Sequence, residues 1–316
     1  MFWRGRASWR CPRFRFCGDT ISPLALTLLD GALLLMVVIW GSNFSLVKVA
    51  LRDFPEIPFN AMRLLIGSAV FMAVLWWNRD TERQQAPLTR TDWLQLLFLG
   101  IVGTFLYQLC FVGGVRRTSV ANSSLIVGIS PMVIALLSAM AGHERIKPVR
   151  WIGVFLALAG LYLIVGHGAE LSGQTLYGDA LMLGGVLCWA VYSVASQPIL
   201  KRHSALTVIG LTFTLGAVMY VVAMIPVLVT VDWGSISPQS WGLMLASTLL
   251  ALNLAYFIWY TGLKKLGGSR TSVYSYLTPV VAMVVASVWL AEPVSANQLA
   301  GAGAVFAGLV ITRFGT

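Results

Sequence analysis

Charged side chains are scarce in this chain of 316 residues, making up 11% of it, whereas soluble domains carry about 25%. Histidine occurs only three times and cysteine four times, with no spacing typical of a zinc site or a disulfide framework. The sequence also lacks a G-x-x-x-x-G-K-[ST] phosphate loop, an H-E-x-x-H metal motif and a G-x-S-x-G elbow. These absences argue against an enzyme of those classes, and we expect no metal or other cofactor.

The residues present are mainly apolar, with 58% hydrophobic. They occur in runs of about 20, the length of helix that crosses a hydrocarbon core of about 30 Å. The net charge of +10 does not indicate nucleic acid, because the basic residues lie between these runs. No run alternates like a strand, so we predict an all-α polytopic membrane protein with ten transmembrane helices, surrounded by lipid. The expected spans are residues 31–51, 57–78, 92–113, 119–141, 149–166, 179–200, 204–230, 241–262, 269–291 and 297–314.

Lysine and arginine are distributed unevenly between the two sides of this bundle. Seventeen of the 22 fall on the side that carries both termini, four fall on the other, and Arg63 lies within a span. The positive-inside rule therefore predicts cytoplasmic N- and C-termini. Residues 1–29 hold five of the arginines. We interpret this tail as an orientation signal without its own fold, and binding to anionic lipid is the alternative.

The two halves of the sequence match at a nearly constant offset. Trp40 recurs as Trp189, 149 positions later. At an offset of 148 the equivalent pairs are Gly114 and Gly262, Pro131 and Pro279, Glu144 and Glu292, Gly153 and Gly301, and Gly160 and Gly308. Such an offset indicates a duplicated unit.

We assign the first repeat to residues 30–167 and the second to residues 177–314. Each repeat contains five predicted spans, and five is an odd number. The second repeat must therefore enter the membrane from the opposite face. This predicts an inverted repeat, an architecture common among secondary transporters.

Several strings resemble the EamA-type members of the drug/metabolite transporter superfamily. They include residues 40–44 (WGSNF), Arg63, and residues 290–293 (LAEP), with the paired prolines and glycines above. The resemblance covers residues 30–314 and implies a carrier of small organic metabolites, often an exporter, in a bacterial inner membrane. It also implies that spans one to four and six to nine form a midplane site, with spans five and ten in support.

We therefore predict that the chain exports an amino acid or a related amphipathic solute by alternating access. An uptake permease is the alternative, and an intramembrane lipid-modifying enzyme is a more distant one. Glu144 and Glu292 fit helix caps or loops, and Ser295 with Gln298 fits a capping box, so no carboxylate near a span centre suggests the coupling ion. The protein is expected to be a monomer or a homodimer.

Two basic residues and two prolines lie inside predicted spans. Charge within a membrane is costly, so Lys48 and Arg63 are candidates to bind an anionic group. Both are long enough to reach the interface instead, where Asp53 and Glu56 could pair with them. Pro131 and Pro279 are predicted helix kinks, whose freed carbonyls face either a cavity or a packed neighbour.

Aromatic and polar residues at middle depth complete the predicted site. An aromatic-walled cavity with a few hydrogen-bonding groups suits an amphipathic solute, although interhelical packing also uses such residues. With Lys48 and Arg63, the candidate substrate-binding residues are Trp40, Asn43, Tyr107, Asn122, Trp189, Tyr192, Asn253, Tyr256, Tyr274 and Tyr276.

Overall fold

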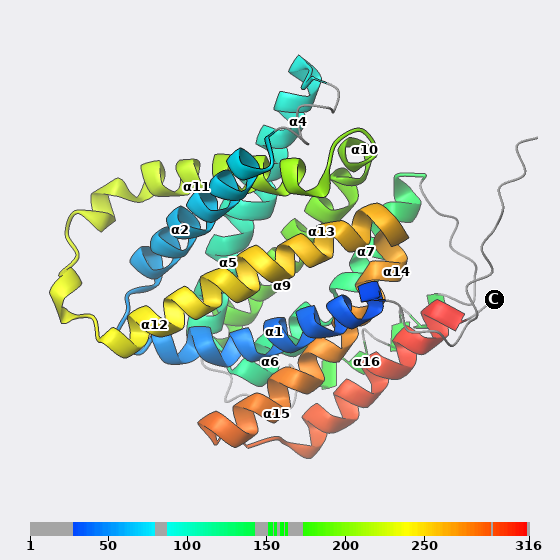
Figure 1. Ribbon diagram of the computed structural model, residues 1–316. Helices are drawn as coiled ribbons and strands as arrows, with labels where there is room; N and C mark the ends of the chain where they lie inside the picture. The colour runs from blue at the N-terminus through cyan, green and yellow to red at the C-terminus, as the bar shows by residue number, and fades with distance from the viewer. Residues whose placement is uncertain are drawn as a thin grey trace, which may run out of the picture.

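The computed structural model describes residues 28–79, 87–142, 151–153, 155–156, 159–160, 162–163, 173–291 and 293–314. Within these ranges the chain forms helices joined by short connections, and no strand occurs (Figure 1). Seven of the described helices are long and apolar enough to cross a membrane, and a shorter apolar helix covers Tyr274–Leu290. The predicted all-α polytopic membrane fold is confirmed.

The first half of the chain contributes four described spans. Its elements are α1 (Leu28–Ala50), α2 (Glu56–Trp77), α4 (Arg90–Gly100), the π-helical segment η1 (Ile101–Leu106), α5 (Tyr107–Arg117), α6 (Val120–Val127) and α7 (Ser130–Met140). The third span is continuous from α4 through η1 to α5. Half of the predicted fifth span lies outside the described residues, and so do Glu144 and the tail up to residue 27.

The second half repeats this order. Its elements are α9 (Gly173–Ala195), α10 (Gln197–Leu200), α11 (Ala205–Leu228), the 3₁₀ turn η2 (Trp233–Ser235), α12 (Pro238–Ala246), the π-helical segment η3 (Ser247–Leu254), α13 (Ala255–Leu266), α14 (Gly268–Ser272), the 3₁₀ segment η4 (Val273–Leu277), α15 (Thr278–Leu290) and α16 (Ala296–Phe314). Glu292 lies outside the described residues. The predicted tenth span corresponds to α16.

Side-chain caps set several of these helix starts. Ser119, Ser204 and Ser237 each accept a hydrogen bond from the backbone N–H three residues on. The predicted capping box is also present, because Ser295 N–H donates to Gln298 Oε1 over 3.0 Å and Gln298 N–H donates to Ser295 Oγ over 3.1 Å. Short polar sequences therefore separate the apolar helices at defined points.

The outside of the bundle is apolar. Leu94, Val222 and Val288 are 61%, 60% and 84% exposed, respectively. Such exposure would be unfavourable in water, but a lipid environment solvates these side chains. The lipid-facing surface therefore follows from the same composition that predicted the spans.

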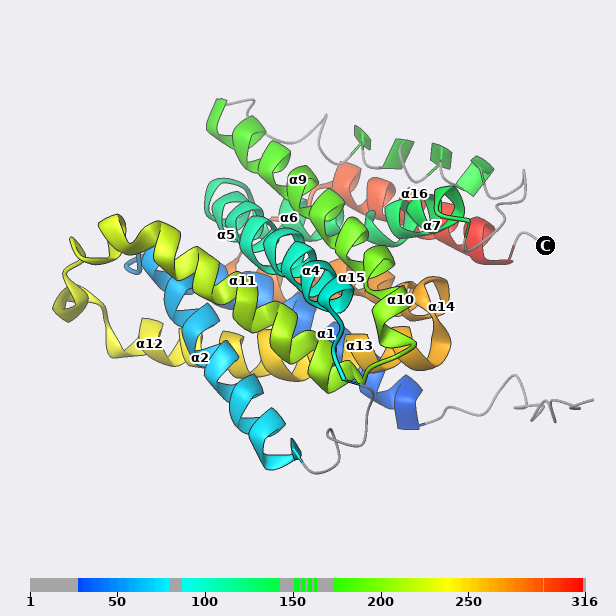
Figure 2. The ribbon, with the colours of Figure 1, turned by 90° about the horizontal axis from the view of Figure 1, so that it is seen from above.

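The two halves pack against each other across the centre of the bundle. Helix α2 crosses its counterpart α11, α5 lies beside α9, and α1 packs against α15 (Figure 2). Equivalent residues meet there: the ring centroids of Trp40 and Trp189 are 5.6 Å apart, and Gln108 Nε2 donates to Tyr256 Oη over 3.4 Å. A residue can touch its own counterpart only near a symmetry axis. A pseudo-twofold axis therefore passes between the two members of each pair.

Candidate functional site

The third and eighth spans change their hydrogen-bonding pattern at equivalent positions of the two repeats. The third span becomes π-helical over Ile101–Leu106, and the eighth does so over Ser247–Leu254. A shift of 148 residues places the first segment inside the second. π-Helical segments are rare and occur often at functional sites, because they redirect side chains and carbonyls. The indole N–H of Trp40 donates to the carbonyl of Ala251 in η3 over 3.1 Å.

The fourth and ninth spans are each interrupted just before a proline. In the fourth, α6 ends at Val127 and α7 begins with Ser130, followed by Pro131. In the ninth, the 3₁₀ segment η4 precedes Thr278 and Pro279. The Ser130 hydroxyl donates to the Val127 carbonyl over 2.6 Å, which replaces the backbone bond that Pro131 cannot make.

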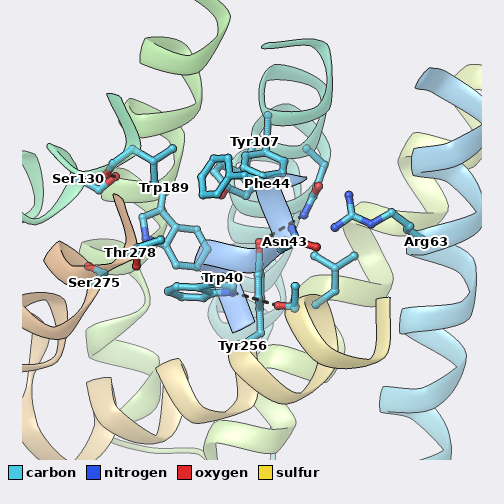
Figure 3. A pocket seen from close by; sticks show the side chains of 15 residues that line it. Trp40, Asn43, Phe44, Arg63, Tyr107, Ser130, Trp189, Tyr256, Ser275 and Thr278 are labelled. Carbon is cyan, nitrogen blue, oxygen red and sulfur yellow. Dashed lines mark hydrogen bonds between the residues drawn. The ribbon is translucent and has the colours of Figure 1, made fainter. Parts of the chain in front are cut away.

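A pocket lies where these interruptions converge (Figure 3). Its accessible volume of about 50 Å³ exceeds the roughly 10–15 Å³ that one water requires, so several waters fit. Side chains of both repeats surround it. The lining residues are Trp40, Asn43, Phe44, Arg63, Tyr107, Gln108, Phe111, Val127, Ser130, Trp189, Ala251, Leu252, Tyr256, Ser275 and Thr278.

Aromatic rings form the walls of this pocket. Trp189 is central, with its ring centroid 5.2 Å from that of Tyr107 and 5.2 Å from that of Tyr256. Trp40 meets Tyr256 edge to face at 6.1 Å. These separations are typical of favourable aromatic pairs. The walls are therefore mutually packed and hold a defined shape.

One cation borders the pocket. Arg63 is fully buried, and none of its three guanidinium nitrogens has a hydrogen-bond partner among the described residues. Its guanidinium carbon lies 5.2 Å from the centre of the Phe59 ring, and its head points toward Asn43 (Figure 3). The lining residues include no Asp or Glu. The pocket therefore contains a positive charge that its own walls do not balance.

A known protein family matches each of the two repeats. The EamA-like transporter family matches residues 28–166 and again residues 176–314. The chain belongs to this family. It is thus a multi-pass membrane transporter in which the EamA domain occurs twice.

Its relatives align along nearly the whole chain. The uncharacterized transporter YyaM of Bacillus subtilis is 28% identical over 85% of this chain and 88% of its own length. A probable amino-acid metabolite efflux pump of Salmonella typhimurium is 29% identical over 90% of this chain and 95% of its own length. A crystal structure with 21% identity covers 89% of this EamA-like transporter and 96% of its own chain, with a TM-score of 0.66, and shows the same fold.

In this EamA-like transporter, Lys48 is held away from the pocket lining. Its Nζ donates to the carbonyl oxygens of Val115, Arg116 and Thr118, over 3.0, 3.4 and 2.5 Å. These carbonyls lie at the C-terminal end of α5, where a cation is electrostatically favourable. The contact favours a structural role for Lys48 over contact with a solute.

The remaining predicted residues divide between the pocket and its surroundings. Six of the twelve line it: Trp40, Asn43, Arg63, Tyr107, Trp189 and Tyr256. The other five besides Lys48 lie elsewhere. Asn122 accepts from Gln298 Nε2 over 3.3 Å, Asn253 donates to the Gly67 carbonyl over 2.9 Å, Tyr192 shares a hydrogen bond with Thr212 over 3.2 Å, Tyr274 donates to Asp30, and Tyr276 is buried.

The twelve candidates did not include several small or apolar lining residues. Val127 and Ser130 are equivalent to Ser275 and Thr278 at the offset of 148, and all four line the pocket. The Thr278 hydroxyl has no hydrogen-bond partner among the described residues. The repeat register combined with the proline positions could have found this group. Ala251 and Leu252 carry no such signal, because only the π-helical turn directs them inward.

Proposed function

We propose that this protein is a secondary transporter for a small organic solute that bears a carboxylate, such as an amino acid or a related amphipathic metabolite. It exports the solute across the bacterial cytoplasmic membrane by alternating access, with both chain termini in the cytoplasm. The observation that carries the proposal is the buried Arg63 guanidinium beside an aromatic-walled pocket.

A buried charge without a partner is unfavourable by several kcal/mol. A carboxylate in the pocket would balance the charge of Arg63 and accept two parallel N–H···O bonds from it. The unfavourable free energy of the buried Arg63 charge is therefore offset only when the solute is bound. This explains why the cation lies on a pocket wall and not against a protein carboxylate.

The rest of the pocket suits the body of such a solute. Trp40, Trp189 and Tyr256 provide flat apolar surfaces. On the side away from Arg63, Ser130 and Thr278 bring hydroxyl groups to the helix interruptions (Figure 3). A molecule with an anionic end, an apolar middle and a polar second end matches this order.

The distribution of basic residues and the efflux pump among the relatives support the orientation and the direction. The side with seventeen lysines and arginines carries both termini. The Salmonella typhimurium relative is named for amino-acid metabolite efflux. Uptake by the same architecture is the competing direction.

The experiment compares metabolites inside and outside cells that express the wild type, Arg63→Gln or Arg79→Gln. Arg79 is the control, because it is exposed at the end of α2 with its guanidinium carbon 5.2 Å from the Trp76 ring centre. We expect wild type and Arg79→Gln to move the same carboxylate-bearing solute into the medium. Arg63→Gln should lower the apparent affinity by about 10- to 100-fold, because hydrogen bonds to a charged group contribute about 1.5–3 kcal/mol.

The solute so identified is then tested with purified protein in vesicles. Arg63→Lys should restore part of the transport, since it keeps the charge but loses the paired geometry of the guanidinium. Transport by Arg63→Gln at the wild-type rate would overturn the proposed role of the carboxylate. Depletion of the solute from the medium, in place of its accumulation there, would overturn export.

A further inference from the structure

At one end of the bundle, the turn that follows α1 reaches across to the second repeat. Asp53 in this turn accepts a hydrogen bond from the backbone N–H of Ser237 over 3.1 Å. It also accepts a hydrogen bond from the hydroxyl of Ser240. Ser237 and Ser240 lie at the N-terminus of α12, where a carboxylate is favoured by the exposed N–H groups. We call this contact the outer latch, since the predicted orientation places it outside the cell.

At the opposite end, the turn that follows α10 reaches across to the first repeat. Arg202 forms an ion pair with Asp92, with 2.6 Å between Nη2 and Oδ1. His203 Nε2 lies 3.4 Å from the other oxygen of the same carboxylate. Asp92 belongs to the first turn of α4, and its exposed fraction is 1%. We call this contact the inner latch.

The two latches are the same contact made twice. Asp53 and Arg202 are equivalent at the offset of 149, and Asp92 and Ser240 are equivalent at the offset of 148. In each case, the turn after the first helix of one repeat binds the N-terminus of the third span of the other repeat. The positions of the acidic residue and its partner are swapped: the acid lies on the turn in the outer latch and on the helix in the inner latch.

Each turn is also fastened to its own repeat. Glu56, just after the outer turn, forms two hydrogen bonds with Arg117 at the end of α5, over 2.8 and 3.1 Å. Lys264, near the end of α13, donates to the carbonyl of His203 in the inner turn over 2.9 Å. The turns therefore move with their own repeats, and a latch must break when the two repeats separate at its face.

The two ends of the third span, and likewise of the eighth, therefore contact different repeats. One end of each binds its own repeat, through Arg117 or Lys264, and the other end binds the opposite repeat through a latch. The π-helical segments η1 and η3 lie between those ends; η3 contributes Ala251 and Leu252 to the pocket lining, and η1 directly precedes the lining residue Tyr107. Because π-helical hydrogen bonds are less regular than α-helical ones, each segment is a natural point of bending.

We propose that the outer and inner latches hold the two faces of the transporter shut in turn. Asp53 closes the outer face and the pair formed by Asp92 and Arg202 closes the inner face, so that breaking one latch shifts the protein toward opening at that face. The proposal rests on alternating access, which is part of the proposed function. It assigns roles to residues outside the pocket.

The test measures from which side the pocket can be reached. Ser275→Cys places a thiol in the pocket lining, in a full-length chain whose four native cysteines are replaced by serine. A membrane-impermeant methanethiosulfonate is applied to intact cells and to inverted vesicles. Asp53→Ala should raise the ratio of outside to inside labelling by about tenfold, because it removes charge-assisted hydrogen bonds. Arg202→Ala should lower the ratio by about tenfold, because it removes the partner of the buried Asp92 carboxylate.

The controls are charged residues near each end that contact groups of their own repeat. Asp232 accepts from the backbone N–H of Gly234 over 3.1 Å in its own turn, and Arg79 packs on Trp76 of its own repeat. Asp232→Asn and Arg79→Ala should leave the labelling ratio within about twofold of the starting protein, since exposed charges away from other features change stability little.

The repeat itself provides a rescue. Asp53→Arg alone should open the outer face, whereas Asp53→Arg combined with Ser240→Asp rebuilds there the Arg–Asp pair of the inner latch. The double variant should return the labelling ratio to that of the starting protein. Size-exclusion profiles and unfolding temperatures identify variants that fold, and Ser240→Ala replaces Asp53→Ala if the latter does not.

Opposite shifts for the two latches, with rescue, support the proposal. Equal labelling in all well-folded variants, or shifts in the same direction, would overturn it. Labelling requires no solute, so these outcomes are independent of the Arg63 experiment. If transport depends on Arg63 but the latch variants have no effect, the proposed function stands and the latch proposal is wrong. If the latch variants shift the labelling but the protein moves no carboxylate, only the proposed substrate class is wrong.

Discussion

Trp40 and Trp189 occupy equivalent positions in the two repeats, and their indole rings meet edge to face across the pseudo-twofold axis, with planes at 86°. Their surroundings nevertheless differ. Trp40 donates to the carbonyl of Ala251 in the π-helical segment η3, whereas Trp189 lies between Tyr107 and Tyr256. The symmetric residue pair therefore supports an asymmetric pocket.

Replacing Trp40 by phenylalanine tests this asymmetry. Trp40→Phe keeps an aromatic ring but leaves the Ala251 carbonyl without its indole donor. We expect a loss of about 1 kcal/mol in the free energy of unfolding, as for other single hydrogen bonds. Thermal unfolding in detergent measures it, with Trp189→Phe as the equivalent variant in the other repeat. A larger loss in Trp189→Phe would contradict the importance of the Ala251 contact.

Gly103 in η1 has no room for a side chain. A Cβ atom at this position would lie 2.1 Å from the ring of Tyr192. We expect Gly103→Ala to destabilise the protein by about 1–3 kcal/mol through overpacking. Unfolding temperature and yield measure the effect, and Gly242→Ala is the control because nothing lies within 4 Å of that Cβ position. Adding Tyr192→Leu should recover part of the loss, and a stable Gly103→Ala protein would argue against the close approach.

Lys48→Gln introduces the residue that the second repeat carries at the equivalent position, Gln197. Because the Lys48 ammonium binds carbonyls at the end of α5, we expect a lower unfolding temperature, from a loss of about 1–3 kcal/mol. The apparent affinity for the solute should stay within about twofold of the wild type, unlike that of Arg63→Gln. An affinity loss as large as that of Arg63→Gln would return Lys48 to the binding site.

The outer latch should weaken in acid. Hydrogen bonds from Ser237 and Ser240 lower the pKa of Asp53 from its ordinary value of 3.8. A carboxylate whose folded pKa is depressed contributes stability above its unfolded pKa, and this contribution is lost as the pH falls through the folded pKa. We expect the unfolding temperatures of wild type and Asp53→Asn to differ at neutral pH and to converge below about pH 4. A constant difference at all pH values would contradict this linkage.

Several features of the fold follow from local sequence. Apolar runs of membrane-spanning length predict helices because lipid offers no partner for backbone groups. The offset of 148 or 149 residues predicts the equivalence of Trp40 with Trp189 and of Pro131 with Pro279. Ser295 and Gln298 predict their own capping box, because that motif involves only four consecutive residues.

The candidate site depended on contacts between residues far apart in the chain. Lys48 and Arg63 are both basic residues within predicted spans, yet α5 offers carbonyl groups to Lys48 and no described group accepts from Arg63. Nothing in the composition of η1 or η3 marks a π-helix, and Asn253 turns out to bind the Gly67 carbonyl and not the pocket. Hydropathy shows which segments are apolar enough to lie in lipid, and the nearly constant offset shows that these segments occur twice. The sequence alone therefore determined the spans and their duplication. Which polar groups find partners depends on how the two halves meet, and only the tertiary structure decided that.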